Sequence, residues 1–145
     1  EGNWELAQKN VAQFGARCCV LHGAVWHEPA QLRYAGARES GYSVMTPDGH
    51  LPGATVSAVT VEELIERLGS SKVDFVKMDL EGAEAELIPR AKPWAHRVRS
   101  LKVEVHPEKV SPPYSLEKCR RDLERVGFVV TRDPSHPACL FAWQP

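Results

Sequence analysis

The sequence has almost no net charge and no long apolar run. Its 18 Lys and Arg residues nearly balance 19 Asp and Glu residues, for a formal net charge of −1, which argues against a protein that binds nucleic acid through bulk electrostatic attraction. No apolar stretch approaches the roughly 18 residues of a membrane span, and the N-terminus has no signal-peptide pattern. Motifs of the GxSxG, HExxH, P-loop and CxxC types are also lacking, which excludes several common hydrolase and nucleotide-binding classes.

Cysteine is scarce as well. Of the four cysteines, Cys18 and Cys19 are adjacent and cannot readily form a disulfide with each other. They lie in an apolar run, whereas Cys119 and Cys139 are far away in the sequence at no metal-like spacing. We therefore expect reduced thiols in the protein core, as is typical of a cytoplasmic protein.

The composition is that of one ordinary domain. The 145 residues, 43% of them hydrophobic, suffice for a hydrophobic core but are too few to divide comfortably into two. No repeat or low-complexity tract interrupts them. We therefore expect a single domain over residues 1–145.

Hydrophobic periodicity and turn residues predict an alternation of helices and strands. In the first half, we expect a helix over residues 3–14, a strand over 17–25, short strands over 31–34 and 42–45, and a turn-rich segment over 46–53. In the second half, we expect helices over residues 60–68, 82–88 and 115–126, strands over 73–80 and 101–106, and short strands over 128–131 and 139–143.

The order of these elements predicts the fold class. Strand–helix–strand from residue 73 onward is typical of parallel βαβ units, whereas the last two strands are joined by too short a loop for a parallel crossover. We therefore predict a doubly wound α/β fold, with an open, mostly parallel sheet that ends in an antiparallel hairpin. Such sheets bind ligands beyond the carboxyl ends of their strands, which is where we expect the chemistry.

Polar side chains gather where two of the expected strands end. Strand alternation places Lys77 and Asp79 on one face of VDFVKMDL, and Glu104 and His106 on one face of LKVEVH. If these strands are neighbours, the four side chains converge at the C-terminal edge of the sheet. His106 or Asp79 is then a candidate general base, with Lys77 and Glu104 setting charge and orientation.

Two other interpretations of this cluster stay open. Asp79, Glu104 and His106 carry oxygen and nitrogen ligands that can bind a divalent cation. The cluster is also consistent with a structural role, in which a buried Lys–Glu pair braces the two strands and His106 only caps an edge.

Other polar residues have simpler explanations. Glu84, in the first turn of an expected helix, suits the helix dipole. The basic stretch 90–102 could contact phosphates, but the balanced net charge favours a solvated connector. His22, inside an apolar run, is most simply a core or edge histidine, and His136 lies in turn-rich surroundings without the spacing of a metal site.

The segment VDFVKMDLEGAEAELI (residues 73–88) resembles the sequence signature of FkbM-type S-adenosylmethionine-dependent methyltransferases. The resemblance continues in VSAVTVEELIERL, although Val61-Glu62 replaces the family's usual Leu-Asp, in SLKVEVHPE, and in the closing hairpin. Upstream, HGAVW (residues 22–26) resembles the segment that borders the adenine, and EGNWELAQKNV resembles the segment whose acidic residue binds the ribose, with Gly2 in place of a proline. The resemblance implies a Rossmann-like fold and methyl transfer from S-adenosylmethionine, in which the cofactor supplies the reactive carbon.

The resemblance also implies roles for particular residues. On the cofactor side, the acidic residue that holds the ribose is Glu1, Asn3 matches the same motif, and the adenine is lined by His22, Gly23 and Ala24. On the acceptor side, Asp79 lies beside cofactor and acceptor, and His106 is the candidate base with Lys77 and Glu104 as its neighbours. This assignment contains no metal ligand, and whether a cation joins Asp79 and His106 stays open. The implied reaction is O-methylation of a hydroxyl on a sugar, a polyketide or another small metabolite.

In the family this chain resembles, a first strand, a glycine-rich turn and a helix precede the segment that contains Glu1. Such a unit takes roughly 30 residues or more. We therefore expect the N-terminal strands of the sheet to be missing, with a gap on the order of 10–15 Å between an edge strand at 17–21 and the strand at 73–80. Either the native chain is longer, or this protein repacks or pairs with another chain to close the gap, and this chain alone is expected to bind S-adenosylmethionine poorly or not at all.

A different class of function is the alternative. A truncated, non-catalytic α/β module could bind a protein partner, or a second copy of itself, through its open sheet edge. The methyltransferase interpretation calls for a small hydroxyl-bearing acceptor. Neither interpretation calls for a membrane or nucleic acid.

Overall fold

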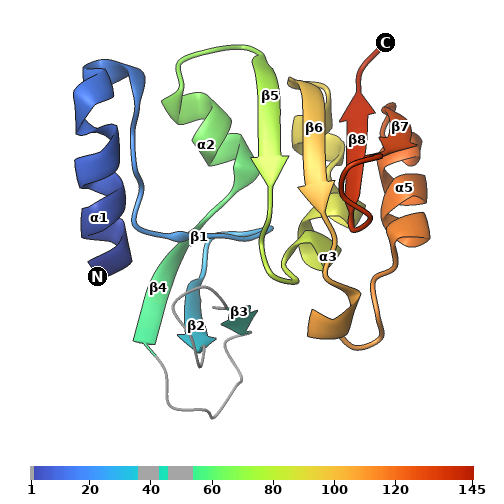
Figure 1. The fold of residues 1–145 in the computed structure, drawn as a ribbon, viewed down its shortest axis with the longest axis horizontal. Helices are drawn as coiled ribbons and strands as arrows, with labels where there is room; N and C mark the ends of the chain where they lie inside the picture. Colours follow the sequence, from blue (N-terminus) through green and yellow to red (C-terminus); the bar gives the residue numbers. More distant parts are fainter. Residues whose placement is uncertain (1, 36–42, 46–53) are drawn as a thin grey trace.

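The computed structural model describes residues 2–35, 43–45 and 54–145, which form a mixed α/β fold with two separate four-stranded sheets. The N-terminal sheet has the order β1-β4-β2-β3 and the C-terminal sheet the order β5-β6-β8-β7 (Figure 1). The strands are β1 (Ala24–Val25), β2 (Gln31–Ala35), β3 (Ser43–Met45), β4 (Ala54–Val59), β5 (Val73–Met78), β6 (Val98–Glu104), β7 (Val129–Arg132) and β8 (Cys139–Trp143).

The sequence predicts a mostly parallel sheet, and this prediction is wrong for the described strands. Only β1–β4 and β5–β6 pair in parallel, whereas β2–β3, β2–β4, β6–β8 and β7–β8 are antiparallel. The consecutive strands β2–β3 and β7–β8 are joined by connections too short for a parallel crossover, which needs a dozen or more residues. The predicted β5–helix–β6 crossover and the closing β7–β8 hairpin are confirmed.

Helices pack against one face of the C-terminal sheet. They are α2 (Val61–Arg67), α3 (Glu84–Leu87), η2 (Ile88–Arg90), α4 (Lys92–Ala95) and α5 (Leu116–Arg125). Leu101 and Val103 of β6 and Leu140 of β8 are buried with these helices in one core cluster. On the opposite face Phe75 is 52% exposed and Trp143 is 41% exposed. Within the described residues the fold is therefore not doubly wound.

Local signals account for where the helices begin and end. Thr60 Oγ1 accepts a hydrogen bond from the Glu63 amide at 3.1 Å, and Glu63 Oε2 accepts one from the Thr60 amide at 2.9 Å, so α2 begins with a capping box. The helix expected over residues 82–88 is shorter, because α3 changes to the 3₁₀ helix η2 where Pro89 provides no amide hydrogen. The basic stretch 90–102 is not a solvated connector, since it forms α4 and much of β6 and buries Trp94.

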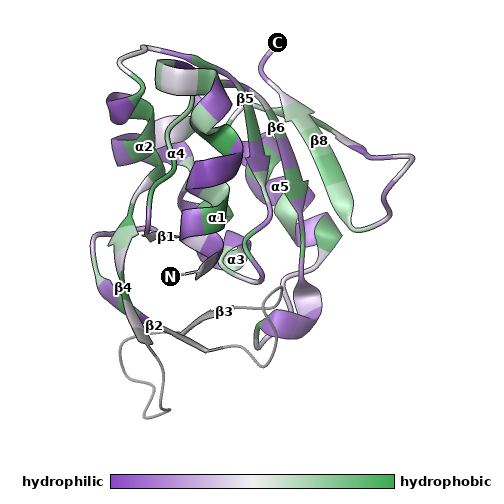
Figure 2. Cartoon of the chain, turned by 60° about the vertical axis from the view of Figure 1, so that its left-hand side comes forward, coloured by the Kyte–Doolittle hydropathy of each residue, from purple (hydrophilic) through white to green (hydrophobic). Residues whose placement is uncertain are grey.

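The N-terminal region departs most from the sequence predictions. The expected helix is present as α1 (Gly2–Val11) and η1 (Ala12–Arg17), but none of their residues is buried. α1 carries both hydrophilic and hydrophobic residues (Figure 2). The strand expected over residues 17–25 is reduced to β1, and β4 was not anticipated because its small and polar residues lack a strong strand pattern.

The cysteines divide into two pairs. Cys18 and Cys19 are exposed, so the prediction of core residues is wrong for them, whereas Cys119 and Cys139 are buried and all four are free thiols. Burial raises the pKa of Cys119 to about 12 and also raises the pKa of Cys139. Among the described helices, none is both long and apolar enough to cross a membrane.

Candidate active site at the carboxyl ends of β5 and β6

The strands β5 and β6 lie side by side in parallel, with Lys77 opposite Lys102 in the register. Both strands therefore end at the same edge of the sheet (Figure 1). Lys77 Nζ donates a hydrogen bond to Asp79 Oδ2 at 2.6 Å, and this bond raises the pKa of Lys77. The Lys77 and Asp79 side chains are 54% and 38% exposed, so the buried Lys–Glu brace considered from the sequence is wrong.

His106 joins this pair from the segment after β6. Its Nε2 lies 3.8 Å from Asp79 Oδ1 and 3.9 Å from Glu104 Oε1. The convergence of Lys77, Asp79, Glu104 and His106 is thus confirmed. One ligand atom each from Asp79, Glu104 and His106 can come within 4.8 Å of one another, so a divalent cation also fits the geometry.

Glu84 is the residue that sequence reasoning missed. It is 1% exposed, and its Oε1 accepts a hydrogen bond from the His106 amide at 2.7 Å and lies 3.1 Å from His106 Nδ1. Its Oε2 accepts a hydrogen bond from the Gly82 amide at 3.0 Å. A carboxylate oxygen accepts, so the 3.1 Å contact is a hydrogen bond with the hydrogen on His106 Nδ1, and Nε2 lies toward Asp79 and Glu104.

The helix-dipole interpretation of Glu84 is therefore insufficient. The sequence signal that was overlooked is its spacing: Glu84, Leu87 and Ile88 follow the i, i+3, i+4 pattern of a buried helix face. A carboxylate on such a face needs a partner, because an unpaired buried charge is strongly unfavourable. His106 and the Gly82 amide supply that partner.

A tight turn places Glu84 in this position. Glu81 and Gly82 adopt positive φ values of +52° and +112°. A Cβ atom at Gly82 would lie 2.9 Å from the Cβ of Lys109, in the 3₁₀ helix η3 (Pro107–Lys109). Lys109 Nζ also lies 3.3 Å from Glu81 Oε2. The turn therefore packs directly against the segment that follows His106, and only glycine fits at its tightest point.

The residues expected on the cofactor side lie in the N-terminal region. Glu1 is outside the described residues. Asn3 lies in the first turn of α1, and the next residue, Trp4, has its ring centroid 5.4 Å from that of His22. His22 is exposed, so of the two expectations, a core or an edge histidine, the core position is wrong.

Packing explains the small residues that follow His22. A Cβ atom at Gly23 would lie 3.1 Å from the carbonyl oxygen of Ser57 in β4. Ala24 is buried in a cluster that also contains Trp26 and Ala83. Because Ala83 belongs to the turn after β5, this cluster holds the His22 segment against the turn that carries Glu84.

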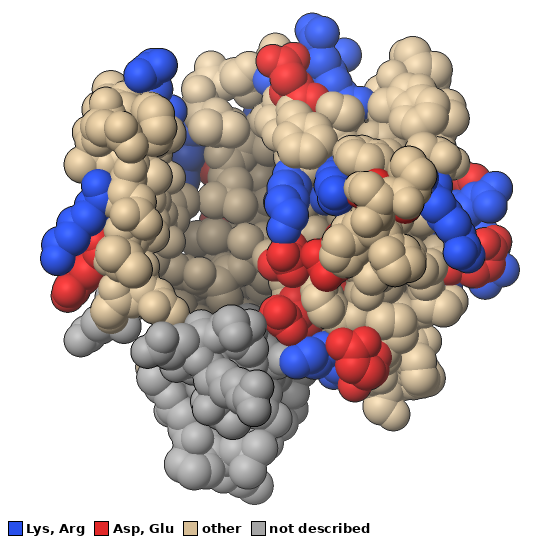
Figure 3. All heavy atoms as spheres, in the orientation of Figure 1, with Lys and Arg blue, Asp and Glu red and all other residues tan. Residues whose placement is uncertain are grey.

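A hollow separates α1 from β5 (Figure 3), and charged side chains of both signs gather over β5 at its rim. In the sequence, Asn3 and Trp4 belong to α1 on one side of this hollow, and Lys77 and Asp79 belong to β5 and the segment after it on the other. The two groups of predicted site residues therefore belong to separate elements (Figure 1).

Buried Glu84 and partly buried His106 thus meet at the carboxyl end of the parallel β5–β6 pair. The family model described as "Methyltransferase FkbM domain" matches residues 23–130. The chain belongs to the FkbM methyltransferase family. No curated protein and no solved structure matches the chain.

Membership of the FkbM family implies a Rossmann-like fold and methyl transfer that depends on S-adenosylmethionine. The matched region runs from Gly23 to Val130 and includes Asp79, Glu84 and His106. It excludes α1 and β8. The cluster of Lys77, Asp79, Glu104 and His106 thus lies within the matched FkbM domain, whereas Asn3 and the residues of the final strand lie outside the match.

Proposed function

We propose that this FkbM domain methylates a hydroxyl group of a small molecule, such as a sugar or a polyketide, with His106 as the general base. One observation carries the proposal: buried Glu84 holds His106 Nδ1 at 3.1 Å and leaves Nε2 directed to the strand ends. Ligands bind at these ends in open α/β sheets. A base with one nitrogen fixed and the other open is suited to take the hydroxyl proton.

The carboxylates around His106 suit two positive charges in such a reaction, the imidazolium of His106 and the sulfonium of the cofactor. After proton transfer, the imidazolium of His106 has Glu84, Asp79 and Glu104 oxygens within 3.9 Å, which offset its positive charge. The cofactor, when bound, supplies a methyl group on a positively charged sulfonium. Asp79, oriented by its hydrogen bond to Lys77, offers a negative charge near that position.

The cofactor's nucleoside belongs on the other side of the hollow in this proposal. Asn3 and the exposed ring of His22 are the described polar groups there, and Gly23 and Ala24 shape the backbone beside them. The packing of Ala83 against Ala24 supports a single site that spans both groups. These cofactor-side roles rest on the family resemblance and on this proximity.

The experiment that tests the base is a comparison of His106→Ala with His96→Ala. His96 is an exposed histidine after α4 and serves as the matched control. We measure S-adenosylmethionine affinity by calorimetry and transfer of labelled methyl groups to a panel of hydroxylated acceptors. In a chain that also carries the glycine-rich unit expected before residue 1, His106→Ala should lower turnover by about 10²–10⁴-fold with little change in cofactor affinity, and His96→Ala should change neither. Equal losses of turnover and affinity in His106→Ala would remove His106 from the base role.

The variant Glu84→Gln tests whether Glu84 orients His106 for the reaction or only supports the fold. The amide has almost the same size but lacks the charge that holds His106 Nδ1, so the pH–rate profile should shift while the cofactor affinity stays unchanged. A purely structural Glu84 would lower the folded fraction without moving the profile.

A second candidate function is a partner-binding module without catalysis. Among the described strands, β5 pairs only with β6, so its other edge is open, and Phe75 beside this edge is 52% exposed. Open strand edges accept a further strand. Calorimetry with the oligomeric state recorded distinguishes the two functions. A concentration-dependent dimer of this chain with an ordered sheet would favour the module, whereas stoichiometric heat with S-adenosylmethionine would favour the methyltransferase.

A further inference from the structure

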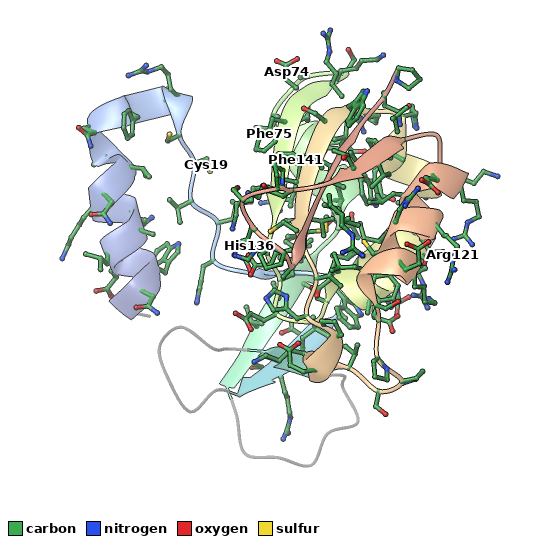
Figure 4. All side chains as sticks on the ribbon, turned by 45° about the vertical axis from the view of Figure 1, so that its right-hand side comes forward. Cys19, Asp74, Phe75, Arg121, His136 and Phe141 are labelled. Atoms are coloured by element: carbon green, nitrogen blue, oxygen red, sulfur yellow. The ribbon has the colours of Figure 1, made fainter. Side chains whose placement is uncertain are left out.

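The loop between β7 and β8 brings a histidine and a cysteine to Glu104. Cys139 lies directly opposite Glu104 in the antiparallel β6–β8 register, so both side chains project from the same face at close range. His136 Nδ1 lies 3.3 Å from Cys139 Sγ, and His136 Nε2 lies 3.8 Å from Glu104 Oε1. Figure 4 shows His136 on the same side of the sheet as Phe75 and Phe141.

These distances suit a tetrahedral metal ion. Bonds of about 2.3 Å to sulfur and about 2.0–2.1 Å to nitrogen or oxygen place neighbouring ligand atoms about 3.3–3.6 Å apart. One nitrogen of His136, Cys139 Sγ and one Glu104 oxygen all lie within 4.8 Å of one another. Small side-chain rotations are enough to bring all three to one ion.

The loop that carries His136 is held in place by its own hydrogen bonds. Lys102 Nζ donates to Asp133 Oδ2 at 2.6 Å, and Asp133 Oδ1 accepts from the Ser135 amide and hydroxyl at 2.8 and 2.6 Å. The Cys139 amide donates to the His136 carbonyl at 3.0 Å. The ligands are therefore ordered before an ion binds, which lowers the entropic cost of binding.

We propose that Glu104, His136 and Cys139 form a binding site for a divalent cation of the zinc class. A thiolate, an imidazole and a carboxylate are the ligand types that Zn²⁺ combines, and three protein ligands leave a fourth position for water or another ligand. Binding releases the Cys139 thiol proton to solvent. The site goes beyond methyl transfer, and two of its three ligands lie outside the matched FkbM region.

Glu104 also belongs to the neighbouring cluster with Asp79 and His106. That cluster contains no thiol, and His106 Nδ1 is already engaged by Glu84. A soft cation therefore prefers the side of Glu104 that faces Cys139.

Cobalt(II) binding tests the site without any methyl-transfer assay. The background variant is Cys18→Ser/Cys19→Ser, because these exposed thiols could bind cobalt on their own. Under reducing conditions this background should bind one Co²⁺ per chain, with a near-ultraviolet sulfur-to-cobalt absorption band that Zn²⁺ abolishes. Cys139→Ser should eliminate the band, His136→Ala should weaken Co²⁺ binding by at least about 100-fold, and His106→Asn should retain both within a few-fold.

The His136 variant protects the test from a folding artefact. The His136 side chain is 47% exposed, so His136→Ala leaves the core intact, whereas Cys139 is buried and Cys139→Ser needs a circular-dichroism control. A band that survives Cys139→Ser, losses in His106→Asn equal to those in His136→Ala, or no binding by the folded background would each overturn the proposal.

Discussion

The N-terminal and C-terminal sheets each contain four strands, but they bury very different side chains. Against the C-terminal sheet lie large aliphatic and aromatic residues from several helices, including Leu87, Trp94 and Leu123. The N-terminal cluster is made of Ala24, Trp26, Leu32, Ala58 and Ala83, and three of these five are alanines. α1 contributes no buried residue to either cluster.

The difference teaches where each half of the site obtains its rigidity. Glu84 and His106 stand on elements that bury a large apolar core, which keeps their geometry fixed in the absence of ligand. The residues proposed for the cofactor side lie on α1 and in the segment that leads into β1, and α1 buries no side chain, so it opens at a lower free-energy cost. In the proposed function, the acid–base half is therefore preformed, and the nucleoside half is the part that a ligand or partner orders.

The largest expected effect contrasts the two regions directly. Leu101→Ala removes a fully buried side chain from the C-terminal core and should lower the free energy of unfolding by about 2–5 kcal/mol. Leu6→Ala, at a position 56% exposed on α1, should change it by less than about 0.5 kcal/mol. Urea unfolding followed by circular dichroism measures both, and similar values for the two variants would contradict the comparison.

A smaller effect is expected at the turn that joins the two regions. Gly82→Ala introduces a Cβ at φ +112°, only 2.9 Å from the Cβ of Lys109, and should cost about 1–3 kcal/mol of stability. Gly69→Ala is a suitable control, since it shares a positive φ of +65° but meets nothing within 4 Å. Denaturant unfolding should therefore show the larger loss for Gly82→Ala, and equal losses for the two variants would contradict a role for the contact with η3.

The smallest effect concerns the pH dependence of the C-terminal sheet. Hydrogen bonds from Lys102 and then Ser135 hold the pKa of the Asp133 carboxyl well below its usual range. Its folded-state pKa is thus lower than the unfolded-state value of about 3.9, so its contribution to stability is complete above about pH 5 and is lost as the pH falls.

Asp133→Asn should consequently be less stable than the parent at neutral pH and should lose less further stability on acidification. Urea unfolding at a series of pH values measures this slope. Asp74→Asn is the control, because its side chain is 89% exposed and only 3.3 Å from an exposed Arg99, where ion pairs contribute little. Parallel pH curves for the parent and Asp133→Asn would contradict the prediction.

The predictions from sequence succeeded where a local pattern is sufficient. The capping Thr60 and Ser115, the alternation in β5 and β6, and the short loop before β8 each act within a few residues. They allowed the cluster of Lys77, Asp79, Glu104 and His106 to be foreseen.

The failures at the candidate site involve contacts between distant residues. The role of Glu84 depends on His106, 22 residues later, and the exposure of Cys18 and Cys19 depends on the absence of a strand that their apolar run seemed to require. The sequence spacing of His136 and Cys139 does not indicate a metal site. Their closeness to Glu104 becomes visible only in the β6–β8 register, which pairs Cys139 with Glu104.

The sequence by itself determined the FkbM relationship, the helix boundaries set by caps, and the residue types available at the strand ends, because these depend on local order along the chain. Only the tertiary structure decided which carboxylate holds His106, that the strands divide into two mixed sheets, and that Glu104 lies between two clusters. Pairing register and burial decide such matters, since both depend on residues that the chain brings together only when it folds.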